Sequence, residues 1–137
     1  MKYLLDTNVC IALINERSPF IGTRFLKELA KGAQLFVSSI VALELWYGVA
    51  TSKHKVINAQ RVGTFFAGHV AVLPFEEEDA RIAGRIRAAI EADGKPVGAY
   101  DLLIASQALR HEMILVTANT REFARIKNLQ WEDWTKS

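Results

Sequence analysis

Short apolar runs alternate along this chain with longer segments that have a helical pattern. The expected strands are 3–5, 35–37, 70–73, 113–117 and, at an edge, 129–131. The expected helices are 9–14, 20–31, 39–50, 53–66, 76–92 and 99–111, followed by a helical turn at 119–125. Short apolar strands joined by helices are typical of a parallel sheet with helices on both faces. The sequence therefore predicts an α/β protein with three layers, α/β/α.

The length and composition predict a single soluble domain over residues 1–137. Half of the residues are hydrophobic and 23% are charged, as in ordinary globular proteins. No apolar run approaches the roughly 20 residues of a membrane span. Asp6 interrupts the apolar stretch near the N-terminus, so this stretch is a poor match to a signal peptide. Cys10 is the only cysteine, so no internal disulfide can form. We therefore expect a cytoplasmic protein without a membrane segment.

The first expected strand ends at a carboxylate. Asp6 follows the apolar run 3–5 and is itself followed by Thr7 and Asn8. In open parallel sheets, ligands bind at the carboxyl ends of strands, so Asp6 occupies a position suited to a functional site. Asp or Thr at this position would also cap the helix that begins near Val9. This stretch alone leaves both interpretations open.

Two further carboxylates are predicted on the apolar faces of helices. Glu44 follows Val41 by three residues and directly precedes Leu45, and Asp101 precedes Ile104 by three. Acidic side chains are seldom buried unless they are paired. Neither carboxylate has a basic residue three or four positions away that could serve as a local partner.

One explanation for these inward carboxylates is that each pairs with an arginine from another part of the chain. The other is that Asp6, Glu44 and Asp101 converge and share a cation, which we favour because unpaired buried carboxylates are costly. Oxygen ligands with no Cys or His beside them suit Mg²⁺ or Mn²⁺. We expect Asp6 and Asp101 to be metal ligands. We expect Glu44 to be a further ligand or to orient a nucleophilic water.

A fourth candidate carboxylate, Glu122, follows the strand that ends near Thr117. It could take part in catalysis, or it could be a surface residue beside Arg121 or Arg125. Asn119 lies between the strand end and Glu122. The site therefore contains either three or four acidic side chains.

Hydroxyl and carboxamide side chains surround the candidate carboxylates in the sequence. We expect Thr7, Asn8, Thr117 and Asn119 to donate hydrogen bonds that fix the carboxylates and reduce their mutual repulsion. For Thr117 the alternative is a hydroxyl that caps the turn after its strand.

The distribution of charge favours contact with a nucleic-acid backbone. Setting aside the four candidate carboxylates leaves 11 acidic residues against 17 basic ones. A basic surround of an acidic, metal-filled pocket would attract phosphates. The candidates for such contacts, each of which could instead be an ordinary solvated residue, are Arg17, Lys53, Lys55, Lys95, Arg121 and Arg125.

Five motifs in order resemble the PIN-domain ribonucleases and, among them, the toxin half of VapBC-type toxin–antitoxin pairs. The motifs are distributed along nearly the whole chain: LLDTN at 4–8, SSIVALELWYG at 38–48, GAYDLLIA at 98–105, VTANTREF at 116–123 and LQWEDW at 129–134. Each motif alone is weak evidence, but their order in a chain of this length is specific.

The resemblance implies a parallel sheet with strand order 3-2-1-4-5. It also implies an Mg²⁺- or Mn²⁺-dependent endoribonuclease, with tRNA as a common target class, that forms a homodimer and is blocked by a small VapB-like antitoxin. Many relatives carry an aspartate at the position of Asn119, and here the last acid would be Glu122. The competing interpretation is a module that binds nucleic acid or protein through a degenerate site.

Overall fold

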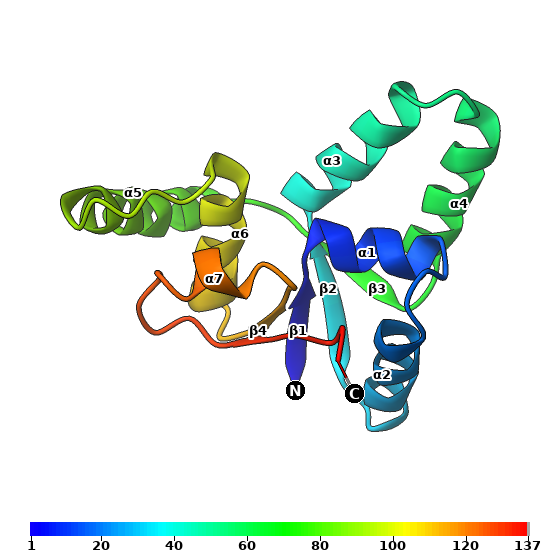
Figure 1. Ribbon diagram of the computed structural model, residues 1–137, viewed down its shortest axis with the longest axis horizontal. Helices are drawn as coiled ribbons and strands as arrows, with labels where there is room; N and C mark the ends of the chain where they lie inside the picture. The colour runs from blue at the N-terminus through cyan, green and yellow to red at the C-terminus, as the bar shows by residue number, and fades with distance from the viewer. Residues whose placement is uncertain (137) are drawn as a thin grey trace.

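All the strands of this protein lie in one parallel sheet, in a computed structural model that describes residues 1–136 (Figure 1). The order is β3-β2-β1-β4-β5, which confirms the expected topology. The strands are β1 (Lys2–Leu5), β2 (Gln34–Ser38), β3 (Val70–Leu73), β4 (Ile114–Val116) and β5 (Trp131–Glu132). Because β2 and β4 pair with opposite edges of β1, the strand order reverses beside β1. A ligand site is expected at the carboxyl end of that strand.

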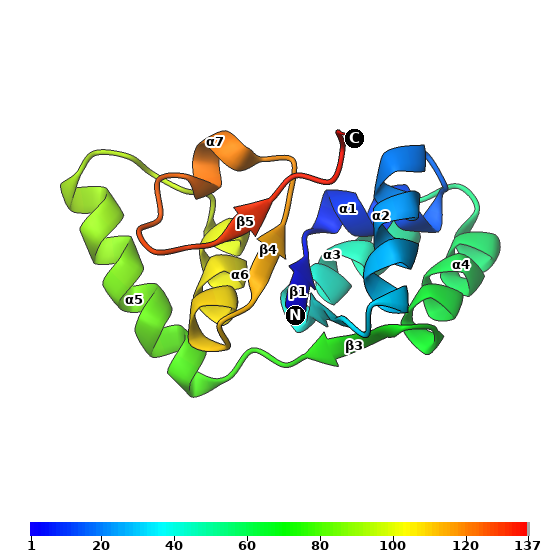
Figure 2. The same ribbon diagram turned by 90° about the horizontal axis from the view of Figure 1, so that it is seen from below.

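The helices lie in two groups on either side of the sheet, which confirms the three layers (Figures 1 and 2). One group contains α1 (Thr7–Ile14), α2 (Pro19–Ala30), α3 (Ser39–Ala50) and α4 (Lys55–Ala67). The other contains α5 (Glu77–Ala92), α6 (Ala99–Arg110) and α7 (Thr120–Phe123). Within residues 1–136, no helix is long and apolar enough to span a membrane.

The core is built on the two central strands. Leu4, Leu5, Leu115 and Val116 are fully buried, as expected for parallel strands that are covered on both faces. Trp134 is also buried and packs edge-to-face on Tyr3, with 5.1 Å between the ring centroids. The C-terminal segment is therefore part of the core.

The face that α2 buries could not be predicted from its apolar residues alone. Leu26 is 66% exposed, whereas Glu28 is 4% exposed. Glu28 tolerates this burial because Tyr3 Oη donates to its Oε1 at 3.1 Å and Arg24 forms an ion pair with its Oε2 at 3.3 Å.

The helix that carries Glu44 begins at a serine cap. Ser38 is fully buried, and its hydroxyl accepts a hydrogen bond from the backbone N–H of Ile40 at 3.0 Å.

Replacing Ser38 by alanine should lower the free energy of unfolding by about 1 kcal/mol, because the first turn of α3 loses this acceptor. Urea unfolding measures the change. Thr51→Ala, at the exposed end of α3, is the control and should change stability by less than about 0.5 kcal/mol; equal losses in both variants would contradict the assignment.

Candidate active site

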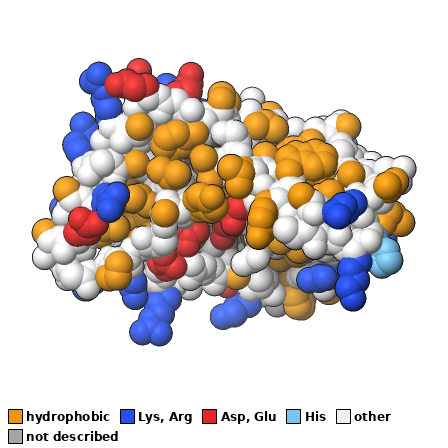
Figure 3. Space-filling model, turned by 90° about the horizontal axis from the view of Figure 1, so that it is seen from above, with side chains coloured by type: hydrophobic (Ala, Val, Ile, Leu, Met, Phe, Trp, Pro, Cys, Tyr) orange, Lys and Arg blue, Asp and Glu red, His pale blue; other side chains and the backbone are white. Residues whose placement is uncertain are grey.

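Four carboxylates lie near the carboxyl-terminal edge of the sheet, beside the point where the strand order reverses. Asp6 directly follows β1, Glu44 lies in α3, Asp101 in the first turn of α6 and Glu122 in α7. Figure 3 views the molecule from this edge and shows acidic side chains gathered in the middle of the face, with apolar surface on both sides. The fold thus brings together acidic residues from four separate elements.

Asp6 both caps a helix and contributes a carboxylate to this group. Its Oδ1 accepts a hydrogen bond from the backbone N–H of Thr7 at 2.7 Å, which caps α1. Its Oδ2 accepts from the hydroxyl of Thr117 at 2.7 Å, and its own N–H donates to the carbonyl of Val116 at 3.0 Å. Asp6 is 6% exposed, so these bonds fix a nearly buried carboxylate at the end of β1.

Thr7 links Asp6 to the second carboxylate. Its hydroxyl donates to Oε1 of Glu44 at 2.8 Å, while its backbone N–H donates to Oδ1 of Asp6. Asn8, which was also expected to donate to the carboxylates, is exposed at the start of α1. The hydrogen bonds to the four carboxylates among residues 1–136 do not include its side chain.

Asn119 links the other two carboxylates. Its carboxamide donates to Oδ2 of Asp101 at 3.3 Å and to Oε2 of Glu122 at 2.9 Å. The second oxygen of Glu122 accepts the backbone N–H of Gly98 at the start of α6. A Cβ at position 98 would lie 3.3 Å from Oε1 of Glu122, so the absence of a side chain permits this close approach.

Thr117 performs both of the roles that its sequence position allowed. Its hydroxyl donates to Asp6, and the same oxygen accepts the backbone N–H of Asn119 at 3.0 Å, which shapes the turn after β4. Thr117 is fully buried. The turn that carries Asn119 is therefore tied directly to the carboxylate at the end of β1.

The carboxylates shift one another's protonation. Burial and then the charges of Asp6, Glu122 and Glu44 raise the pKa of Asp101 to about 7. Burial also raises the pKa of Asp6, although the hydrogen bonds from Thr117 and Thr7 oppose this. The backbone N–H of Gly98 is the main cause of a lowered pKa at Glu122. Without a cation, Asp101 is therefore partly protonated near neutral pH.

Separate arginine partners do not explain these carboxylates. Over residues 1–136, the ion pairs of the structure include none with Asp6, Glu44, Asp101 or Glu122. The uncompensated negative charge and the all-oxygen donor set fit a hard divalent cation such as Mg²⁺ or Mn²⁺. Among the described residues, no three His, Cys, Asp or Glu side chains are already placed to hold one ion together.

The predicted basic contacts divide into those near the site and those farther away. All six residues are exposed. Arg125 donates to the carbonyl of Pro96 at 2.6 Å, so it braces the loop before α6, and its charge contributes to the lowered pKa of Glu122. Arg121 lies in α7 with Glu122, and Lys95 lies in the braced loop. Arg17 follows α1. Lys53 lies in the connection between α3 and α4, and Lys55 is the first residue of α4, at an end of the helix pair that lies away from the sheet (Figure 1).

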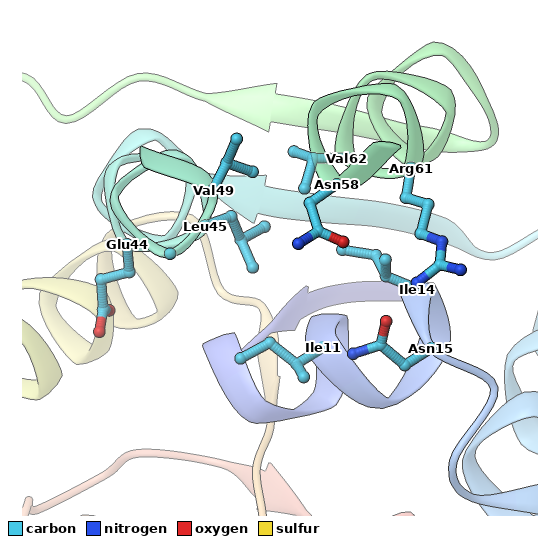
Figure 4. Close-up of a pocket in the computed structure, with 10 residues that line it drawn as sticks. Ile11, Ile14, Asn15, Glu44, Leu45, Val49, Asn58, Arg61 and Val62 are labelled. Atoms are coloured by element: carbon cyan, nitrogen blue, oxygen red, sulfur yellow. The ribbon is translucent and has the colours of Figure 1, made fainter. Parts of the chain in front are cut away.

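A cavity of about 210 Å³ lies beside Glu44, between α1, α3 and α4 (Figure 4). Its walls are mostly apolar, and Asn58 and Arg61 of α4 add polar groups to them. This cavity could not be predicted from the sequence, because Asn58 and Arg61 are polar helix residues with no local sign that they face α1. The residues that line the cavity are Ile11, Ile14, Asn15, Glu44, Leu45, Gly48, Val49, Asn58, Arg61 and Val62.

The sequence matches characterised protein families over nearly its full length. The PIN domain family matches residues 3–129. Ribonuclease VapC2 from Rickettsia felis is 40% identical over 136 residues, which cover 99% of this chain and 100% of that protein. The tRNA(fMet)-specific endonuclease VapC from Shigella flexneri is 36% identical over 135 residues, which cover 98% of this chain and 99% of that protein.

Two solved complexes contain chains with the same fold. One is VapBC2 from Rickettsia felis bound to a DNA fragment from its promoter, with a TM-score of 0.90, 38% identity, and coverage of 98% of this chain and 99% of that chain. The other is DNA-bound VapBC from Salmonella typhimurium, with a TM-score of 0.89, 36% identity and coverage of 98% of each chain.

The raised pKa of Asp101 predicts that metal-free protein loses stability as the pH rises. Asp101 binds its proton more tightly in the folded state than in the unfolded state. The stability that this proton contributes is fully present below about pH 4 and is lost as the pH rises from about 4 to 7. In EDTA at pH 7.5, Asp101→Asn should be more stable than wild type by about 1–2 kcal/mol. The full shift corresponds to roughly 4 kcal/mol, but solvent screens a half-exposed group.

Urea unfolding in EDTA at pH 4.5 and at pH 7.5 measures this difference. At pH 4.5 the two proteins should have more similar stability. If the mutant unfolded at a clearly lower urea concentration than wild type at pH 7.5, Asp101 would instead form a stabilising ion pair.

Proposed function

This chain belongs to the PIN-domain family, and we propose that it is a metal-dependent endoribonuclease that hydrolyses phosphodiester bonds in RNA. The observation that carries this proposal is the group of four carboxylates near the carboxyl edge of the sheet, none of which forms an ion pair with a Lys or Arg of residues 1–136. The identity to ribonucleases over the whole chain supports the reaction class.

Asp6 and Asp101 would hold Mg²⁺ or Mn²⁺. When bound, the ion would stabilise charge on the phosphate and make a water more nucleophilic. Thr117 and Thr7 keep both oxygens of Asp6 in place by hydrogen bonds. In the absence of the ion, the carboxamide of Asn119 bonds to Asp101, while the negative charges of Asp6, Glu122 and Glu44 oppose ionisation of Asp101.

Glu44 and Glu122 serve different roles in this proposal. Only Oε1 of Glu44 is engaged by Thr7, which leaves Oε2 available to orient the attacking water and accept its proton. Both oxygens of Glu122 are engaged, by Gly98 and Asn119. Glu122 therefore acts by positioning the start of α6, and Asn119 supplies a donor at the position where a further acid would favour a second ion.

We propose RNA, and in particular tRNA, as the substrate. One relative is named a tRNA(fMet)-specific endonuclease. Arg121 lies in α7 with Glu122, Arg125 follows that helix, and Lys95 lies in the loop before α6. All three are exposed, where they can contact the phosphate backbone. Such a substrate places the protein in the cytoplasm.

We propose that a small VapB-like antitoxin inhibits the enzyme, as the similar chains in solved structures occur in VapBC complexes. The apolar cavity beside Glu44 suits an apolar segment of that partner. A basic side chain that extends from the segment could reach the carboxylates and displace the ion. A homodimer is also proposed, with the exposed side chains of Leu43, Trp46, Tyr47 and Tyr100 as candidates for its interface.

The first test is cleavage of purified tRNA. With Mn²⁺ or Mg²⁺ the protein should release discrete fragments, and EDTA should stop the reaction. Asp6→Asn and Asp101→Asn should each lower the rate by more than about 100-fold, since loss of even an outer-shell partner costs roughly 10–100-fold. Asp93→Asn, an exposed carboxylate at the end of α5, is the control and should keep full activity. RNA binding without EDTA-sensitive cleavage would favour the degenerate binding module.

The second test concerns the cavity. Placing a charge among its apolar walls, as in Ile14→Glu, should weaken binding of the cognate antitoxin by at least about 10-fold while cleavage by the free protein continues. Calorimetry with the antitoxin and tRNA cleavage in its presence measure both effects. If the antitoxin inhibited Ile14→Glu at the same concentration that inhibits the wild-type protein, the partner would bind elsewhere.

A further inference from the structure

The C-terminal segment is fastened to α2 by a small polar network. Arg24 donates to Oε1 of Glu132 at 2.9 Å, and the indole N–H of Trp134 donates to the same oxygen at 3.0 Å. The guanidinium of Arg24 lies 5.2 Å from the centre of the Trp134 ring, a cation–π contact. Figures 1 and 2 both show the C-terminal end of the chain beside α2. We call Arg24, Glu132 and Trp134 the C-terminal clasp.

The clasp is anchored in the core rather than on the surface. Trp134 is 1% exposed and packs on Tyr3 of β1. A second branch of the network joins Tyr3 and Arg24 to the buried Glu28. The clasp therefore holds the C-terminal segment against both α2 and the central strand.

The same Glu132 leads from the clasp to the active site. Its backbone carbonyl accepts the N–H of Thr117 at 3.0 Å, and the hydroxyl of Thr117 donates to Oδ2 of Asp6 at 2.7 Å. Strand β5 consists only of Trp131 and Glu132, so sheet pairing alone attaches it weakly to β4. The side chain of Glu132 supplies the additional attachment.

We propose that the C-terminal clasp positions Asp6 for metal binding by holding the carbonyl of Glu132 against Thr117. The inference deepens the proposed function, because it takes Asp6 as a metal ligand. Thr117 is fully buried, so loss of its backbone acceptor would leave an N–H without a partner. The backbone around Thr117 would then shift, and its hydroxyl would no longer fix Asp6. Arg24, Glu132 and Trp134 are thus positioning residues.

The competing view is that the clasp only stabilises the fold. The network offers a matched control, because Tyr3→Phe removes a buried hydrogen bond from the Glu28 branch and leaves the bonds of Glu132 intact. Glu132→Ala removes the side-chain attachment but keeps the backbone carbonyl. Trp134→Phe leaves the Glu132 side chain in place and keeps an aromatic ring, but it removes the indole donor and part of the ring volume that packs in the core.

The test uses the full chain and three measurements on each variant: amide hydrogen exchange by NMR, the Kd for Mn²⁺, and kcat and KM for tRNA cleavage. In Glu132→Ala, exchange of the Thr117 amide should accelerate at least 10-fold relative to the amides of β2. The Kd for Mn²⁺ should rise by about 10-fold, the lower end of the roughly 10–100-fold cost of losing an outer-shell partner. The kcat should fall while KM for tRNA stays near wild type.

Trp134→Phe should change the same quantities in the same direction by a smaller factor, and Tyr3→Phe should change neither the Thr117 exchange nor the Kd. If Glu132→Ala fails to fold, Trp134→Phe decides by the same criteria. Normal Thr117 exchange and Mn²⁺ affinity in the deciding variant would overturn the inference even if wild type cleaves RNA. The predicted changes in exchange and Kd, in a protein that cleaves no RNA, would instead support the clasp and refute the proposed function.

Discussion

Repulsion among carboxylates is the constraint on which the arrangement of this protein depends. Burial and the charges of its three acidic neighbours raise the pKa of Asp101 to about 7, so the group is costly to hold together without a cation. Three side chains oppose this cost by donating hydrogen bonds: Thr7, Thr117 and Asn119. Functional sites often contain such arrangements, which lower the stability of the fold.

The parallel sheet explains how such a group can be assembled from distant parts of the sequence. The reversal of strand order beside β1 places the ends of β1 and β4 next to each other, so Asp6 and Thr117 meet across 111 positions of sequence. Helices α3 and α6 bring Glu44 and Asp101 to the same region. The C-terminal segment then closes over the end of β4, where the carbonyl of Glu132 meets Thr117.

Much of this arrangement could be predicted from local patterns. Asp6 at a strand end, and Glu44 and Asp101 on apolar helical faces, indicated the site, and the alternation of strands and helices indicated the sheet. What could not be predicted depends on long-range contacts. Nothing near Glu28 in the sequence indicates Tyr3 as its partner, and nothing near Glu122 indicates the backbone of Gly98. Asn8 has a suitable side chain and position, yet the start of α1 leaves it exposed.

The central claim is that these carboxylates form a site for one divalent cation. A crystal structure of the protein soaked in Mn²⁺, with anomalous data recorded for manganese, tests it most directly. The account predicts one strong anomalous peak within bonding distance of both Asp6 and Asp101, with Glu122 still bonded to Gly98. No peak at saturating Mn²⁺, or a peak held by other residues while Asp6 and Asp101 stay unchanged, would contradict it.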